Sequence, residues 1–417
     1  MTYLDKQEFL AWAYDDLLTN TTRGVLAEYI VATALGICET KRVEWDQYDL
    51  RFDGIGVEVK SAAYVQSWEQ ARPSEIAFNI RPARGWNASD NTYAANAERS
   101  AAVYVFCLLN GTDRKQIDPL DVAQWTFYVL PTSVLNRKVP TQKTIRLGPL
   151  KDLHPHECAY DELKAAIHQA ARPSVSVRLV EWNVAMSLQT KARHLAKLNP
   201  TVAILPESAN PDKTGQALQD IGATLPPQWD GANPNKGLLA VAFDGWELRV
   251  DDSYDRDYQW VMPLHLTGPR NIRLLAVWDM ADRGHGHEAA RKLGACRASM
   301  DHYQEFLSGD ADLTVISGDF NQSVRWDYPK KRTKFGDFMD QLESRGFVSA
   351  YHHTHPVCER GKEPDPTLWW MRNVCKPYHI DYTFVSRPEA ITAVTVGSSD
   401  DWLAHSDHAP MTVDLQL

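Results

Sequence analysis

Acids, amides and a histidine follow a series of apolar, strand-like stretches in the second half of this 417-residue chain. In chain order they are Asn183, Glu207, Asp319, Asn321, Asp381, Asp407 and His408. A carboxylate that is buried without a partner costs several kcal/mol, so four acids beside hydrophobic strands indicate a cation among them. Carboxylate and amide oxygens are typical ligands of Mg²⁺ and Mn²⁺. The pattern therefore predicts a divalent metal site.

These residue types suit the hydrolysis of a phosphate ester. A hard cation neutralises the charge that develops on phosphorus, and a carboxylate accepts the proton of the attacking water. Amide and imidazole groups donate hydrogen bonds to the phosphate oxygens. Because all three kinds of group occur in the series, no covalent intermediate is required.

In order and local context, these residues resemble the endonuclease/exonuclease/phosphatase superfamily of DNase I-like enzymes, over residues 175–417. The resemblance implies that Glu207 binds Mg²⁺ or Mn²⁺, with Asn183 and Asp407 assisting directly or through water. It also implies that His408 contacts the scissile phosphate and is oriented by Asp381.

The same resemblance assigns roles to two further residues and implies a fold. Asp319 would align or deprotonate the attacking water, and Asn321 would donate hydrogen bonds to a phosphate oxygen. The implied fold is an α/β sandwich of two packed, mainly antiparallel sheets. Inner strands are expected at 177–182, 202–205, 238–243, 272–278, 313–317, 379–385 and 411–415, with covering helices at 288–307 and near 334–344.

Two positions depart from the pattern of many DNA-cleaving members of this superfamily. They carry an acid where this chain has Ala185, and a His or Tyr after the central strand, where this chain has Trp278. We therefore expect fewer metal ligands than in those members. The sequence does not identify the group that protonates the leaving oxygen. His285 and His287 are alternatives for that group, although a solvated loop is the simpler interpretation.

The first half of the chain begins with a predicted helix and hairpin. Residues 25–35 are apolar and Ala-rich and include one acid, Glu28. Polar residues that can cap a helix precede this segment, and Gly36 follows it as a stop. Two strands are expected at 42–52 and 56–64, because an Asp-Gly turn separates two strand-like stretches.

Glu58 and Lys60 lie two residues apart on the second of these strands and therefore share a face, with Asp49 on the paired strand. This arrangement resembles the PD-(D/E)XK nuclease superfamily over residues 21–68, although Asp49 lacks the preceding proline. The resemblance implies that Asp49 and Glu58 hold Mg²⁺ or Mn²⁺, that Lys60 stabilises the attacking hydroxide or the phosphate, and that Glu28 completes the site. An ordinary Glu58–Lys60 ion pair on a solvated strand is the alternative.

Length and composition indicate two globular domains. A chain of 417 residues exceeds one typical core, and a Pro-containing break after a predicted helix at 160–171 separates domains 1–172 and 175–417. No apolar run approaches the ~20 residues of a membrane span. The acidic start and the 6 scattered cysteines predict a cytoplasmic protein.

The formal net charge of -10 argues against a protein that coats nucleic acid by bulk electrostatics. It does not argue against a nuclease, whose contacts are local. A basic stretch with interleaved aromatic residues follows Asn321, as suits backbone contact and stacking. Its candidate nucleic-acid-binding residues are Arg325, Trp326, Lys330, Lys331, Arg332 and Lys334. A solvated loop is the alternative.

The sequence thus predicts a metal-dependent phosphodiesterase that acts on nucleic acid, with DNA favoured and a nuclease site in each half. The fold class is α/β, with a restriction-endonuclease-like core around a mixed sheet followed by a DNase I-like sandwich. Bacterial restriction, phage defence or repair would suit such a pairing. Two alternatives remain: a phosphatase or lipid-type phosphodiesterase of the same superfamily, and a single C-terminal nuclease with an N-terminal nucleic-acid-binding module.

Overall fold

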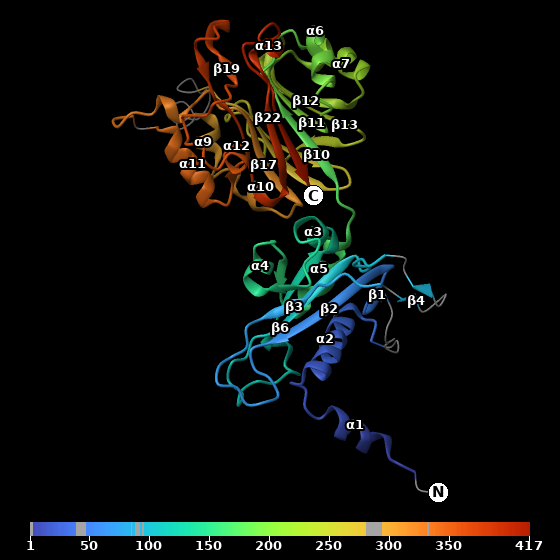
Figure 1. Cartoon of the computed structure of the whole chain (residues 1–417). Helices are drawn as coiled ribbons and strands as arrows, with labels where there is room; N and C mark the ends of the chain where they lie inside the picture. Colours follow the sequence, from blue (N-terminus) through green and yellow to red (C-terminus); the bar gives the residue numbers. More distant parts are fainter. Residues whose placement is uncertain are drawn as a thin grey trace. The chain divides into compact units, whose positions relative to one another are not determined.

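The computed structural model describes residues 3–38, 47–84, 86–87, 92–93, 96–280, 294–331 and 333–417. The chain forms two compact units, Met1–Pro173 and Ser174–Leu417 (Figure 1). Each unit has its own hydrophobic core. Within the described ranges, no helix combines the length and the apolar character needed to cross a membrane.

The first unit is built on a mixed five-stranded sheet. Its order is β1 (Leu50–Phe52), β2 (Ile55–Ala63), β6 (Val103–Leu109), β7 (Trp125–Pro131) and β9 (His156–Cys158). β2 and β6 are parallel, and the other neighbours are antiparallel. Two small sheets pair β3 (Ala77–Asn79) with β8 (Thr144–Arg146) and β4 (Trp86–Asn87) with β5 (Thr92–Tyr93).

Helices cover both faces of this mixed sheet (Figure 1). They are α2 (Asn20–Leu35) and α5 (Leu163–Ala171) on one face, and α3 (Thr132–Lys138) and α4 (Leu147–Lys151) on the other, with α1 (Lys6–Tyr14) preceding them in the chain. Ile30 of α2 and Leu163 of α5 are buried against Val57 and Val103. Val57 and Val59 of β2 belong to the core on the α2 and α5 side, and Ala62 of β2 belongs to the core on the α3 and α4 side.

The helix α2 and the first hairpin follow from local sequence. The side chain of Thr19 caps the amino terminus of α2 by accepting the Thr22 N–H, and Gly36 ends the helix at φ 75°. Asp53 and Gly54 both have positive φ, 48° and 80°. A two-residue type I′ hairpin turn requires this conformation, so the Asp-Gly turn sets the pairing of β1 with β2.

The predicted strand at 42–52 is wrong in its extent. β1 begins only at Leu50, and residues 42–46 lie outside the described residues. The physical reason is visible at Asp49, whose carboxylate accepts the Val59 N–H at 2.7 Å. This side chain takes the place that a backbone carbonyl of a longer partner strand would fill.

The second unit contains two six-stranded sheets. One has the order β12 (Ala223–Asn233), β13 (Lys236–Phe243), β11 (Val202–Ser208), β10 (Ser176–Glu181), β23 (Met411–Gln416) and β22 (Ile391–Val396). The other has the order β14 (Glu247–Val250), β15 (Val261–Thr267), β16 (Asn271–Trp278), β17 (Leu313–Asp319), β21 (Asp381–Val385) and β18 (Val348–Ser349). Two pairs are parallel, β10 with β11 and β16 with β17, and the remaining neighbours are antiparallel.

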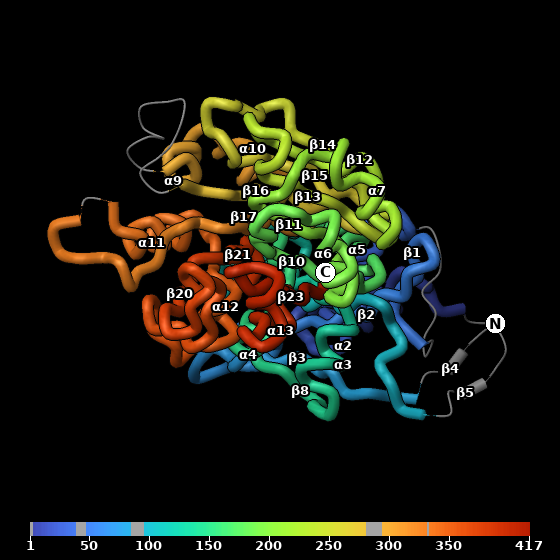
Figure 2. Tube along the Cα trace, turned by 90° about the horizontal axis from the view of Figure 1, so that it is seen from above, coloured from blue at the N-terminus to red at the C-terminus, as the bar shows by residue number. Residues whose placement is uncertain are grey.

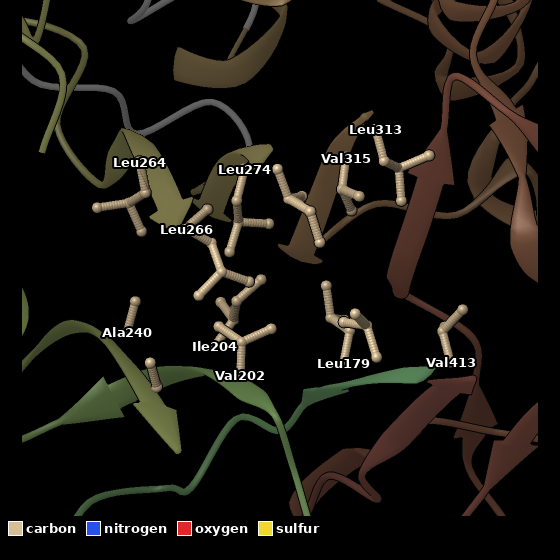
Figure 3. Packing of buried hydrophobic residues seen from close by; sticks show 14 of the residues in the cluster. Leu179, Val202, Ile204, Ala240, Leu264, Leu266, Leu274, Leu313, Val315 and Val413 are labelled. Atoms are coloured by element: carbon tan, nitrogen blue, oxygen red, sulfur yellow. The ribbon is translucent and has the colours of Figure 1, made fainter. Parts of the chain in front are cut away.

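The two sheets pack face to face around one apolar core (Figure 3). Leu179, Val202 and Val413 of one sheet meet Leu274 and Val315 of the other, and all are buried. Full burial of such a side chain is favourable by about 1.5–3 kcal/mol, so their alternation along the strands drives the sheets together. This is the sandwich of two packed sheets that the sequence predicts.

Helices cover the outer faces of the sandwich (Figures 1 and 2). They are α6 (Leu188–Ala196) and α7 (Pro211–Asp220) on the β10–β11 side, and α9 (Ala295–Ser299), α10 (Gln304–Ser308) and α11 (Phe335–Ser344) on the β16–β17 side. Two short helices, α12 (Ala350–Thr354) and α13 (Ser399–Trp402), and a two-stranded sheet of β19 (Leu368–Trp369) with β20 (Pro377–Tyr378) complete the unit.

The predicted single helix at 288–307 is wrong within the described residues. Residues 288–293 lie outside them, and the remainder forms α9 and α10 with a turn between. Cys296, Met300 and Phe306 are nevertheless buried in one cluster. The helical spacing of apolar residues thus identified the buried face but could not show that the chain turns.

Candidate active sites

Strand pairing places the polar residues of the second unit at one end of the central strands of the two sheets. Glu181 at the end of β10 pairs with Ile204 and with Met411, the first residue of β23. Asp319 at the end of β17 pairs with Asp381, the first residue of β21. Figure 2 shows β10 beside β11 and β23, and β17 beside β16 and β21. Side chains that follow one strand therefore meet side chains that precede its neighbour.

Asp319 is the centre of a buried hydrogen-bond network. Its Oδ2 accepts from Nδ2 of Asn183 at 2.9 Å and from Nδ2 of Asn321 at 3.1 Å. Its Oδ1 accepts the Asn321 N–H at 2.8 Å. Because Asp319 is fully buried, these donors fix the direction of both carboxylate oxygens.

His408 joins Asp319 to Asp381. Its Nδ1 lies 3.0 Å from Oδ2 of Asp381, and its Nε2 lies 4.0 Å from Oδ2 of Asp319. One ligand atom from each of the three residues falls within a 4.8 Å group. Of the predicted residues, the structure thus brings Asn183, Asp319, Asn321, Asp381 and His408 together.

Burial and neighbouring charge change the proton affinity of these groups. Burial and the Asp381 carboxylate raise the pKa of Asp319 to about 7. Burial alone would lower the pKa of His408, but Asp381 and Asp319 outweigh it and raise that pKa to about 10. At neutral pH the imidazole is therefore a cation that faces an acid of intermediate strength.

Glu207 and Asp407 stand outside the Asp319 network. Oε2 of Glu207 lies 3.0 Å from Nζ of Lys236, which also lies over the Trp278 ring at 5.3 Å. Asp407 is half-buried and contributes to the raised pKa of His408, whose pKa change is dominated by burial and Asp381. Among the described residues, neither carboxylate bonds to Asp319. Their predicted roles remain predictions.

Sequence reasoning missed Glu181, which is fully buried beneath the network. Within the described structure, neither carboxylate oxygen has a hydrogen-bond partner. Burial first, then Asp381 and Asp319, raise its pKa well above the usual range. A signal was available, because Glu181 continues the inward alternation of Val177 and Leu179.

The acid cluster fits a divalent cation in its chemistry. Asp319 and Asp381 are both fully buried side by side, and a cation offsets the free energy of burying like charges together. Their oxygen donors, like the Glu207 carboxylate, suit Mg²⁺ or Mn²⁺. The compact group found here includes His408 and differs from the predicted ligand set, so the identity of the ligands stays a prediction.

In the first unit, the structure brings the predicted acids and lysine together. Nζ of Lys60 lies 2.6 Å from Oε1 of Glu58 and 3.5 Å from Oδ2 of Asp49. Burial and then Asp49 raise the pKa of Glu58, with a smaller effect of Glu28 on α2. Burial would lower the pKa of Lys60, but Asp49 and Glu58 outweigh it and raise that pKa. The four residues therefore share one electrostatic environment.

The predicted nucleic-acid-binding stretch is partly engaged within the protein. Nη1 of Arg325 donates to the Pro377 carbonyl at 3.1 Å, and the Trp326 ring packs on Tyr378 at 5.1 Å. Lys331 forms an ion pair with Asp327. Lys330 is exposed and Lys334 half-buried, whereas Arg332, His285 and His287 lie outside the described residues. The exposed lysine is the residue that is freest to meet a ligand.

A model of the bacteriophage T4 endonuclease IV family matches residues 12–147. This range contains Glu28, Asp49, Glu58 and Lys60. The resemblance of the same range to PD-(D/E)XK nucleases stays a prediction. A search of curated proteins gave no significant match.

Among solved structures, the chain is similar to an AP endonuclease, an exonuclease and an endonuclease/exonuclease/phosphatase family protein. The AP endonuclease LMAP from Leishmania major is 15% identical over 58% of this chain and 88% of that protein, with a TM-score of 0.43. The 3'-5' exonuclease NExo from Neisseria meningitidis is 20% identical over 57% of this chain and 99% of that protein, with a TM-score of 0.44. An endonuclease/exonuclease/phosphatase protein from Leptotrichia buccalis is 13% identical over 58% and 100%, with a TM-score of 0.40.

Proposed function

We propose that the protein is a metal-dependent nuclease that hydrolyses phosphodiester bonds of nucleic acid, with DNA as the favoured substrate. The observation that carries this proposal is the buried group of Asp319, Asp381 and His408, with Asn183 bonded to Asp319. It combines a proton acceptor, a cationic donor and oxygen ligands in one place, which suits the hydrolysis of a phosphodiester. The proposed domains are 1–172 and 175–417, each with a catalytic site.

In the C-terminal site, Asp319 is the proposed general base. Its pKa near 7 lets it accept the proton of water near neutral pH. His408 is held by Asp381 through Nδ1, so its Nε2–H is free to donate to a phosphate oxygen. Asn321 is placed beside Asp319 and is proposed to donate to a second phosphate oxygen.

A bound Mg²⁺ or Mn²⁺ would neutralise the charge of the phosphate at this site. Glu207, Asn183 and Asp407 are the residues proposed to hold it. Lys236 forms an ion pair with Glu207. The metal cation would therefore compete with this lysine for the Glu207 carboxylate.

The first unit is proposed to carry a second nuclease site. The match of the T4 endonuclease IV family model to residues 12–147 supports a nuclease in this unit. Asp49 and Glu58 are the proposed metal ligands, with Glu28 completing the site. Lys60 lies within 3.5 Å of both ligands, where its charge would stabilise a hydroxide or a phosphate.

Hydrolysis by the purified full-length protein tests the proposed function. We expect cleavage of DNA in the presence of Mg²⁺ or Mn²⁺ and none in EDTA, measured on single- and double-stranded DNA and RNA, linear and circular. Phospholipids and inositol phosphates are assayed in parallel. Hydrolysis confined to those compounds would contradict the nuclease proposal and favour the phosphatase or lipid-type alternative.

The basic stretch is expected to set affinity rather than chemistry. Replacing Lys330 and Lys334 together by Ala should weaken DNA binding and flatten its salt dependence by about one unit of slope for each phosphate that the variant no longer neutralises. Titrations in a series of salt concentrations measure this slope, with the exposed Lys213→Ala on α7 as a control. An unchanged slope in the double variant would make the stretch a solvated loop.

A further inference from the structure

The turn that follows Asn183 has a strained backbone. Ala185, Met186 and Ser187 have φ values of 44°, 64° and 53°. Residues with a Cβ rarely adopt this left-handed conformation, and three in succession are rarer still. Such a backbone persists only where surrounding contacts hold it. The contacts that hold this turn therefore bear on the geometry of the site.

The ammonium group of Lys191 provides these contacts. Its Nζ donates to the carbonyl oxygens of Val184, of Ala185 at 3.3 Å and of Met186 at 2.9 Å. An ammonium group has three N–H donors, so the three carbonyls satisfy all of them. Lys191 is half-buried on α6. Burial and the neighbouring Arg372 lower its pKa to about 8, as expected for an ammonium held mainly by uncharged groups.

The same turn fixes two residues of the proposed metal shell. The Ala185 N–H donates to Oδ1 of Asn183 at 3.0 Å, which leaves Nδ2 of Asn183 directed at Asp319. The Met186 N–H donates to the Glu207 carbonyl at 3.1 Å, and Glu207 itself has a positive φ of 61°. A movement of the turn would therefore move both Asn183 and Glu207.

We propose that Lys191 is a positioning residue of the C-terminal site, whose ammonium group holds the turn 184–186 so that Asn183 and Glu207 are correctly directed. This inference rests on the proposed nuclease function. Lys191 itself does not contact the reacting atoms. Because Ala185 has no carboxylate, the turn offers the site only backbone groups, and Lys191 fixes the direction in which they point.

The first test compares Lys191→Met with Lys197→Met, which removes an exposed lysine at the end of the same helix. Both are made in full-length protein that carries Glu58→Gln, so that the N-terminal site does not contribute. We expect Lys191→Met to weaken Mn²⁺ binding about 10- to 100-fold in titration calorimetry, as removal of an outer-shell partner does. We expect kcat to fall similarly with little change in KM, and Lys197→Met to match its parent.

The second test is chemical rescue of Lys191→Ala. Ethylammonium, which can enter the vacated space and donate to the three carbonyls, should restore part of the Mn²⁺ affinity and of kcat. Ethanol of the same size has no charge and should not. A residue that only fills space would be rescued by both or by neither.

Three results would overturn the proposal. They are Mn²⁺ affinity of Lys191→Met equal to that of Lys197→Met, absence of rescue by ethylammonium, and unfolding of both Lys191 variants in circular dichroism. Failure of the proposed function has a different signature, since the parent protein would then cleave no nucleic acid. In that case the Mn²⁺ affinities and the rescue still decide the role of Lys191.

Discussion

Glu207→Gln and His408→Ala are each expected to reduce hydrolysis by the C-terminal site by about 100-fold or more, the usual contribution of such groups. The first removes the charge that anchors the metal ion, and the second removes a donor that faces the phosphate. Glu207 is partly exposed, at 23% for its side chain, so its replacement should leave the fold intact. Initial rates on DNA with saturating Mg²⁺ measure both effects.

His408→Ala needs a separate control for folding. It leaves Asp381 buried without its imidazole partner, and an unpaired buried charge destabilises a protein. Circular dichroism at the assay temperature separates a decrease in activity from a decrease in structure. His405→Ala, three residues earlier, serves as the matched variant because His405 packs on His194 rather than on the acid cluster. A reduction smaller than tenfold in folded His408→Ala would contradict its assignment.

Lys60→Ala is expected to abolish cleavage by the N-terminal site while sparing metal binding. The measurement uses full-length protein in which Glu207→Gln and His408→Ala have silenced the other site. Lys60 forms ion pairs with Glu58 and Asp49 and therefore competes with a cation for both carboxylates. We expect Mn²⁺ affinity to be unchanged or higher, and the cleavage rate to fall about 100-fold or more.

Two further variants make the N-terminal experiment decisive. Glu58→Gln removes a proposed ligand and should lower both Mn²⁺ affinity and cleavage, whereas Lys164→Ala removes a lysine that lies over the Phe52 ring in the same unit and should lower neither. If the background protein cleaves no DNA or RNA, and Lys60→Ala leaves the products of the otherwise native enzyme unchanged, the two-nuclease proposal is wrong. The nucleic-acid-binding module then takes its place.

Strands that are continuous apolar runs, such as β11 and β17, were predictable, whereas strands with an interrupted pattern were not. Val177 and Leu179 alternate with outward residues, and the predicted strand at 177–182 matches β10 within a residue. β12 was missed because Pro226 and Pro227 interrupt its pattern, and its pairing with β13 shifts register there. β14, β15 and β22 were also missed. For these strands, pairing partners rather than local sequence determine the structure.

The grouping of Asp319, Asp381 and His408 was predictable from their places next to the ends of strands, since Asp319 ends β17, Asp381 begins β21 and His408 precedes β23. The lysine side chains that contact this site were not predictable. Lys191 and Lys236 are ordinary polar residues in the sequence, and only tertiary structure brings one to the carbonyls after Asn183 and the other to Glu207. Glu181 was predictable in part. The alternation along its strand indicates that its side chain points inward, but the sequence does not show that Asp319 and Asp381 lie beside it.

The pairing of Asp319 with Asp381 across β17 and β21 limits how the length of this chain can vary. Side chains alternate along a strand, so inserting or deleting a single residue inside β21 would turn its buried side chains to the opposite face. β17 and β21 can therefore change length without turning these side chains only at the ends far from Asp319 and Asp381. The spacing from Asp381 to Val385, which reaches the apolar core, is in this sense as strictly constrained as the identity of the acids themselves.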